Sequence, residues 1–142
     1  MMFVVIRLRG NVRVNDSASF ALELLRLSNV HNCVVLKDSP DNKGTLVRVK
    51  DYTAFGEVSD ELLKELVAKR GRKIGGSRLE EKEVGKMLKL LGDNKALLEA
   101  GFKPVFRLRP PKKGLKNKKR HYPFGDLGNH GKDINDLLSR MI

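Results

Sequence analysis

Apolar and polar positions alternate in short stretches through the first third of the chain, and their spacing predicts two strands separated by a helix. Residues 3–9 are expected to form a strand whose aliphatic side chains point inward, with Arg7 and Arg9 pointing outward. Apolar residues at helical spacing then predict a helix over about residues 16–27. The run at residues 33–37 is apolar enough to form a central strand of a sheet.

The stretch that follows allows two interpretations. Residues 39–44 combine serine, proline, aspartate, asparagine and glycine, which are the residues of turns. In residues 45–51, alternating aliphatic and basic side chains permit a strand, whereas apolar positions three residues apart permit a helix. We favour the helix, followed by a short strand over residues 53–58.

Helix signals dominate the middle of the chain. Ser59 is expected to cap a helix that Gly71 ends, and a basic, glycine-rich loop follows at residues 71–78. Ser77 and Glu80 have the spacing of a capping box, which predicts the start of another helix. That helix is expected to end at Gly92, and a further short helix is predicted over residues 94–100.

The last third of the chain loses its periodicity and then recovers it. Residues 103–109 predict a final strand with Arg107 and Arg109 facing outward. Residues 110–131 show no hydrophobic period and are expected to form an extended loop. Apolar residues at helical spacing from 134 to 141 predict an amphipathic terminal helix.

The charge balance adds a functional expectation to this α+β pattern. The chain has 142 residues, which suits one domain, and 29 lysines and arginines face 17 aspartates and glutamates. Its formal net charge is +12, and a basic domain of this kind has the electrostatic signature of a nucleic-acid-binding protein. A merely soluble basic protein is the alternative that charge alone leaves open.

Cysteine content and hydropathy indicate whether the protein is exported or inserted into a membrane. Cys33 is the only cysteine, so an internal disulfide is impossible, and its apolar neighbours indicate a buried hydrophobe rather than a nucleophile. The apolar start at residues 3–6 is too short for a signal peptide, and no run approaches the roughly 20 residues of a membrane span. We expect a soluble, unexported protein with no membrane partner.

Residues 100–125 carry the strongest candidate chemistry, because they contain nine basic residues and no acid. Such a segment has little to bury, so we expect a polyanion, here RNA, to order it, and we expect residues 110–131 to be mobile in the free protein. A solvated linker is the alternative. His121, Tyr122 and Phe124 follow and are candidates to stack on bases. The basic residues are Lys103, Arg107, Arg109, Lys112, Lys113, Lys116, Lys118, Lys119 and Arg120.

The glycine-rich loop at residues 71–78 is a second candidate contact. Glycines let backbone amides approach phosphates, and Arg72, Lys73 and Arg78 supply positive charge. The loop lacks the spacing of a nucleotide-binding P-loop, so we expect contact with RNA phosphates or an ordinary loop between helices.

A third cluster comes from the N-terminal strand and the turn after it. Outward-facing arginines there could reach phosphates or stack on bases, although sheet edges also use such charges to prevent aggregation. The residues are Arg7, Arg9 and Arg13.

Catalytic chemistry finds little support in the sequence. The three histidines, His31, His121 and His130, form no recognisable triad pattern with a nucleophile. One cysteine cannot provide zinc-site spacing. We therefore predict no catalytic residues, no metal, no cofactor and no small-molecule substrate.

Several ordered motifs resemble one family over essentially the whole chain. Together they resemble the L-thirty (L30) family of large-subunit ribosomal proteins in its long archaeal and eukaryotic form. The motifs are FVVIRLRG (3–10), LVRVKDY (46–52), GEV (56–58), KRGR (69–72), FRLRPPKKG (106–114), GDLGN (125–129) and IN (134–135).

This resemblance implies a fold and a function. The implied fold is α+β, with a βαβαβ core at residues 1–58 whose small three-stranded sheet is related to ferredoxin-like folds. Residues 59–142 would form a helical extension with the final strand, the basic extended loop at 110–131 and the terminal helix. The matching basic positions are Arg70, Arg72, Arg107, Arg109, Lys112 and Lys113, while Phe55 replaces the tryptophan of many long-form members.

The function implied is that of a structural ribosomal protein, bound to ribosomes in the cytoplasm. Its expected partners are large-subunit ribosomal RNA and neighbouring ribosomal proteins. A free-standing RNA-binding assembly factor with the same fold is the second hypothesis. An enzyme acting on RNA is the third, and it would need a general base or metal site that the sequence does not reveal.

Overall fold

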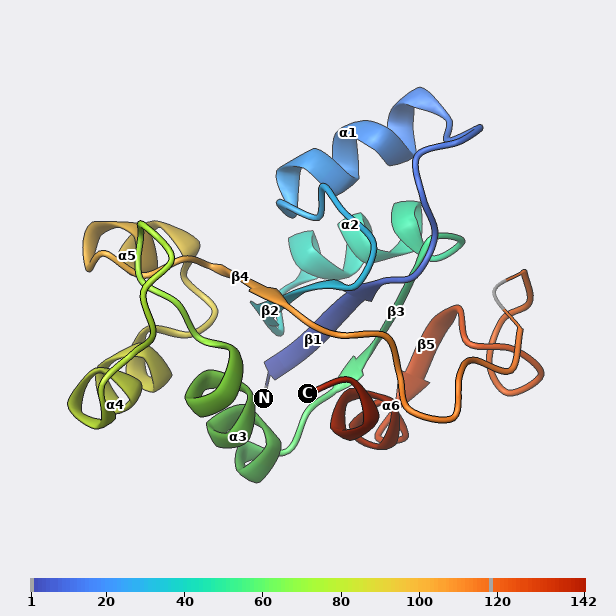
Figure 1. The fold of residues 1–142 in the computed structure, drawn as a ribbon. Helices are drawn as coiled ribbons and strands as arrows, with labels where there is room; N and C mark the ends of the chain where they lie inside the picture. The colour runs from blue at the N-terminus through green and yellow to red at the C-terminus, as the bar shows by residue number, and fades with distance from the viewer. Residues whose placement is uncertain (1, 118) are drawn as a thin grey trace.

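A five-stranded sheet forms the centre of the molecule in the computed structural model, which describes residues 2–117 and 119–142 (Figure 1). The strand order is β4-β2-β1-β3-β5. The strands are β1 (Met2–Arg7), β2 (Asn32–Lys37), β3 (Thr53–Glu57), β4 (Val105–Arg107) and β5 (Gly128–Gly131). The helices are α1 (Asp16–Leu24), α2 (Pro40–Val49), α3 (Asp60–Arg70), α4 (Glu81–Leu90), α5 (Asn94–Glu99) and α6 (Ile134–Met141).

The three strands expected for the core lie together in the middle of this sheet. β1 pairs antiparallel with β2 on one side and with β3 on the other. The later part of the chain adds an edge strand on each side, because β4 pairs antiparallel with β2 and β5 pairs parallel with β3. The α+β class is confirmed, and the sheet is wider than the three strands implied by the family resemblance.

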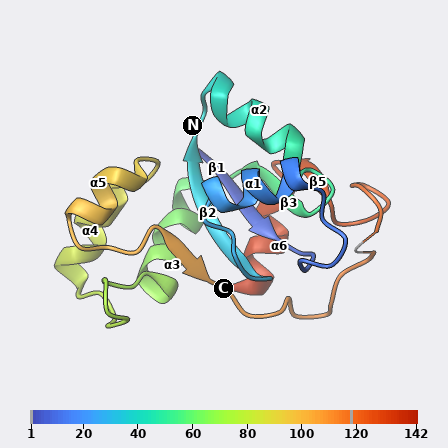
Figure 2. The same ribbon diagram turned by 90° about the horizontal axis from the view of Figure 1, so that it is seen from above.

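Helices cover both faces of the sheet. α1 and α2 lie over one face, and α3 and α6 lie over the other, as the two views agree (Figures 1 and 2). Val5 of β1 packs with the α1 and α2 side chains, whereas Val4 and Ile6 pack with those of α3 and α6. β1 is therefore buried on both faces, and the prediction that Arg7 points outward is wrong, since Arg7 is only 2% exposed.

Helix starts follow the capping chemistry of the sequence, with two corrections. Ser59 caps α3 as predicted. Residues 39–44 are not a turn, because Ser39 caps α2 and Pro40 occupies its first position, where proline needs no hydrogen-bonded amide. The capping box of α4 pairs Glu80 with Glu83, three residues later than the predicted pair.

The end of the predicted loop at residues 110–131 is a strand. The sequence Gly-Asn-His-Gly has no apolar alternation, yet it forms β5 beside β3. A Cβ at Gly56 of β3 would collide with the Gly131 carbonyl oxygen and lie 2.9 Å from Cβ of Ile134, so the close approach requires glycine. Asp126 and Leu127, just before β5, are also buried, so this segment has more to bury than its composition indicated.

Candidate nucleic-acid interface

Basic side chains from three separate segments converge where the end of α3, the 71–78 loop and β4 meet. Two adjoining surface hollows of about 200 and 450 Å³ lie there, and both are lined by Arg70 and Arg72. Lys69 also lines the larger hollow, but its ammonium group is paired with Glu65 at 2.8 Å. We call the remaining cations of these linings the arginine cluster: Arg70, Arg72, Arg78, Lys103, Arg107 and Arg109.

Backbone hydrogen bonds hold the arginine cluster together. The Lys103 amide donates to the Arg72 carbonyl oxygen at 2.9 Å, and the Ile74 amide donates to the Gly101 carbonyl oxygen at 2.8 Å. A Cβ at Gly71 would lie 2.5 Å from the Val67 carbonyl oxygen, so only glycine lets the chain turn so tightly out of α3. The two segments that the sequence identified separately are thus one surface.

The electrostatics of the arginine cluster favour an anionic ligand. No aspartate or glutamate occurs among the described residues that line either hollow. The Arg107 and Arg109 side chains are exposed, and Arg70 and Arg72 are half-buried. Guanidinium groups bind phosphate oxygens through paired, charge-assisted hydrogen bonds, so this surface is suited to successive phosphates of a nucleic-acid backbone.

Lys73 lies beside the arginine cluster but already has an internal partner. Its ammonium group is 2.7 Å from the Glu83 carboxylate. The hydrogen bond with Glu83 raises the pKa of Lys73, and the same bond lowers the pKa of Glu83. Because this charge is compensated within the protein, Lys73 is a weaker candidate for a phosphate contact than the sequence indicated.

Arg7 serves the fold rather than the surface. Its Nη1 donates to the Leu27 carbonyl oxygen at 2.6 Å, its Nε donates to the Arg9 carbonyl oxygen at 2.9 Å, and its Nη2 donates to the Asn11 side chain. Burial lowers the pKa of Arg7. The side chain ties the end of β1 to the chain that leaves α1, so we remove it from the candidate RNA contacts.

Arg9 and Arg13 remain accessible, but they do not form a cluster with Arg7. The Arg9 guanidinium lies 5.7 Å from the centre of the Tyr52 ring, which is a cation–π arrangement. Arg13 is exposed and has a left-handed backbone conformation with φ of 59°.

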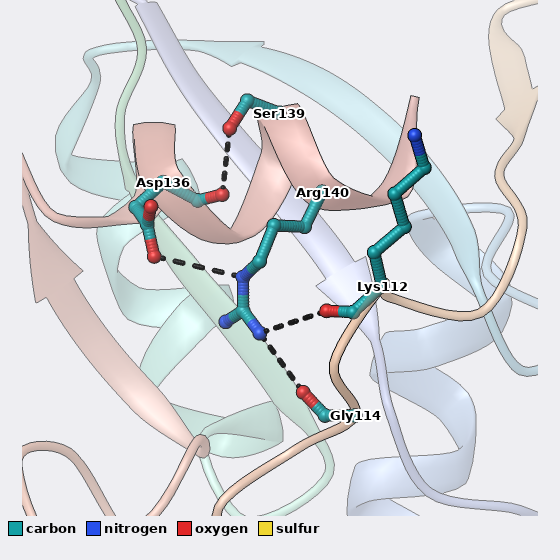
Figure 3. Close-up of polar contacts among 5 residues, drawn as sticks. All are labelled: Lys112, Gly114, Asp136, Ser139 and Arg140. Atoms are coloured by element: carbon teal, nitrogen blue, oxygen red, sulfur yellow. Dashed lines mark hydrogen bonds and ion pairs between the residues drawn. The ribbon is translucent and has the colours of Figure 1, made fainter.

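The basic segment, which we define as residues 112–120, follows β4 and presents several exposed cations. Arg140 of α6 fixes its beginning, because its Nη1 donates to the carbonyl oxygens of Lys112 at 3.2 Å and Gly114 at 2.9 Å (Figure 3). Figure 3 also shows the Lys112 side chain extending away from Arg140, so the backbone is held while the ammonium group stays free to bind a ligand. The exposed cations are Lys112, Lys113, Lys116, Lys119 and Arg120, and Lys118 lies outside the described residues.

Replacing Arg140 by alanine should loosen the basic segment without unfolding the protein. The two carbonyl oxygens that accept from its guanidinium would return to water, at a cost of about 1–2 kcal/mol for exposed hydrogen bonds. We expect amide exchange to accelerate at residues 112–114, measured by hydrogen–deuterium exchange, and to stay unchanged in β1. Arg120→Ala is the matched control, and equal exchange in both variants would contradict this assignment.

The residues that were expected to stack on bases are largely engaged with the protein. Nε2 of His121 lies 2.9 Å from the Asp51 carboxylate, and the Tyr122 hydroxyl donates to the Asp133 carboxylate. The hydrogen bond to Asp133 raises the pKa of Tyr122. Phe124 is 80% exposed and is therefore the aromatic ring best placed to stack on a base.

The metal-binding and membrane-spanning potential of the chain can be assessed over its described residues. Across residues 2–117 and 119–142, no group of three histidine, cysteine or acidic side chains is placed to hold a metal ion. Burial strongly raises the pKa of the Cys33 thiol, as expected for a packed side chain. In the same ranges, no helix has the length and apolar content needed to cross a bilayer.

Comparisons with known proteins point to one family. Residues 3–53 match the family described as ribosomal protein L30p/L7e. The chain is 43% identical to large ribosomal subunit protein uL30 of Archaeoglobus fulgidus, with 99% of each chain covered. It is 38% identical to the protein of the same name from Methanocella arvoryzae, again with 99% of each chain covered. The identity to the Methanosphaera stadtmanae protein of that name is 34%, over 99% of this chain and 100% of that one.

Proposed function

This chain belongs to the ribosomal protein L30p/L7e family, and we propose that its arginine cluster and basic segment bind the RNA of the large ribosomal subunit. The chain is a structural constituent of that subunit rather than an enzyme. Its association with ribosomal RNA and with other ribosomal proteins follows from that membership.

One observation carries the RNA contact: the two hollows of the arginine cluster are lined by cations with no carboxylate among their described residues. Each phosphate that these side chains neutralise releases condensed counterions, which drives binding that does not depend on the base sequence of the RNA. Backbone hydrogen bonds between the 71–78 loop and residues 101–103 position the cluster, so we expect specificity to come from matching the shape of folded RNA. The basic segment adds further phosphate contacts beside this surface.

We further propose that the protein stays on cytoplasmic ribosomes and touches neighbouring ribosomal proteins. A free-standing assembly factor would have to dissociate from mature subunits, and no observation favours that behaviour. The two functions predict different behaviour on a sucrose gradient.

Sedimentation tests the proposal directly. A tagged chain expressed in cells should sediment with large subunits and remain there through a moderate-salt wash. A variant carrying Arg107→Ala and Arg109→Ala should leave the subunit at lower salt, because phosphate contacts set the salt dependence. Recovery of the wild-type chain only on precursor particles, or at the top of the gradient, would contradict the proposal.

A further inference from the structure

A separate hollow of about 340 Å³ lies between the loops that flank α1 and the basic segment. Three stretches that are distant in sequence contribute to it: residues 8–12, residue 30 and residue 119. We call it the valine hollow, and its lining is Leu8, Arg9, Gly10, Val12, Val30 and Lys119. It shares no residue with the two hollows of the arginine cluster.

The two valines of this hollow have no role in the protein core. Val12 is 82% exposed and Val30 is 36% exposed, and neither belongs to the two buried clusters on the faces of the sheet. Isolated exposed aliphatic residues are ordinary, but these two come from different loops and line the same depression. Together they provide an apolar lining that water solvates poorly.

The rim of the valine hollow is cationic. Arg9 and Lys119 line it, and no acid is found in the described part of the lining. Arg9 is held in place by the Tyr52 ring and by a long hydrogen bond from its Nη1 to the Asp51 carbonyl oxygen at 3.4 Å. The Asp51 carboxylate contacts His121 at 2.9 Å. Lys119 belongs to the basic segment, so the hollow is continuous with the surface proposed to follow the RNA backbone.

Backbone conformation adds a second sign of function. Each valine is followed by a residue other than glycine in the left-handed region, Arg13 with φ of 59° and His31 with φ of 67°. Such conformations cost free energy and persist where the surrounding structure fixes them, which is common at binding sites. One residue in each loop around the hollow thus has a backbone conformation that residues other than glycine adopt infrequently.

We propose that the valine hollow takes the base of one unpaired nucleotide of the ribosomal RNA, splayed out of its helix. This inference rests on the proposed function and specifies a ligand that it leaves open. A base has two apolar faces and polar edges, so it fits between aliphatic side chains, while its phosphates meet Arg9 and Lys119. The volume of about 340 Å³ is at the lower end for small-molecule sites, which suits one nucleotide and excludes a duplex.

Crosslinking in assembled subunits tests this inference. A diazirine analogue of leucine is placed in the full chain at Val12, at Val47 or at Arg107, and the adducts on purified large subunits are mapped. Val47 is the matched control, because it is an exposed aliphatic residue of α2, 62% exposed, outside the hollow. We expect Val12 to give one adduct on the base of a single nucleotide, Val47 to give none on RNA, and Arg107 to give RNA adducts.

The outcomes separate the inference from the proposed function. RNA adducts from Arg107 with none from Val12 would overturn the inference and leave the proposed function standing. A Val12 adduct on a protein would also overturn it, because a protein side chain would then occupy the hollow. The absence of RNA adducts at both positions would overturn the proposed function as well.

A second measurement uses variants that keep the fold. Val12→Ser together with Val30→Ser makes the lining polar at two exposed positions, so folding should be unaffected. The nucleotide crosslinked through Val12 should become reactive to a base-modifying reagent, and the affinity for large-subunit RNA should fall about tenfold, as expected when one base loses its stacking. Unchanged reactivity of that base would count against the inference.

Discussion

The variant with alanine at Arg70, Arg107 and Arg109 is expected to bind large-subunit RNA about 100-fold more weakly than the wild-type protein at moderate salt. These three side chains line the adjoining hollows, and no carboxylate in the described linings competes with phosphate for them. Removing three phosphate contacts should also reduce the slope of log affinity against log salt by about 2 to 3. A filter-binding titration at several salt concentrations measures both quantities.

If net charge alone drove RNA binding, removing any three positive charges would weaken it equally. The control variant must therefore remove the same number of charges at positions outside the cluster. Replacing Arg48, Lys64 and Lys95 by alanine removes the same three positive charges from exposed positions on α2, α3 and α5, outside the arginine cluster. We expect this variant to lose only a few-fold in affinity, because long-range attraction is screened over about 10 Å at ordinary ionic strength. Equal losses in both variants would show that the cluster is not the binding surface.

Short-range signals in the sequence were sufficient for most helices. The serine cap of α3 and the apolar spacing of α6 predict those elements from within a few residues, and both helices are found where expected. The start of α2 was missed because Ser39 and Pro40 suit a turn as well as a helix start, and local sequence does not distinguish the two. β5 was missed because its pairing with β3 depends on backbone approach at Gly56.

The candidate site was predicted in composition but not in arrangement. Arg72 and Arg107 were both identified from local charge, yet their shared surface depends on backbone hydrogen bonds between loops about 30 residues apart. The internal partners of the other candidates are equally non-local: Lys73 pairs with Glu83 of α4, and Tyr122 bonds Asp133 just before α6. The sequence shows which charged residues are present, whereas the fold determines which of them lack an internal partner and can bind a ligand.

Arg7 illustrates the same limit and gives the largest expected change in stability. Replacing it by methionine should lower the free energy of unfolding by about 3–5 kcal/mol, because the buried carbonyl oxygen of Leu27 and the partly buried carbonyl oxygen of Arg9 lose a charged donor. Domains of this kind are stable by only about 5–15 kcal/mol, so the change should be plain in a urea titration. Arg7→Lys keeps the charge but cannot place three donors in the same plane, and we expect an intermediate loss.

Arg13→Met is the matched control, since Arg13 lies six positions further on in an exposed turn, and its replacement should change stability by less than about 0.5 kcal/mol. The buried Arg7 and the arginines of the cluster should therefore show their main effects in different assays. Arg7→Met should destabilise the fold and leave the salt slope of RNA binding unchanged at temperatures where the protein stays folded. The arginine-cluster variant should reduce that slope and leave the urea midpoint nearly unchanged. A reduced salt slope for the folded Arg7→Met protein would mean that Arg7 reaches RNA after all, and that its buried hydrogen bonds open when RNA binds.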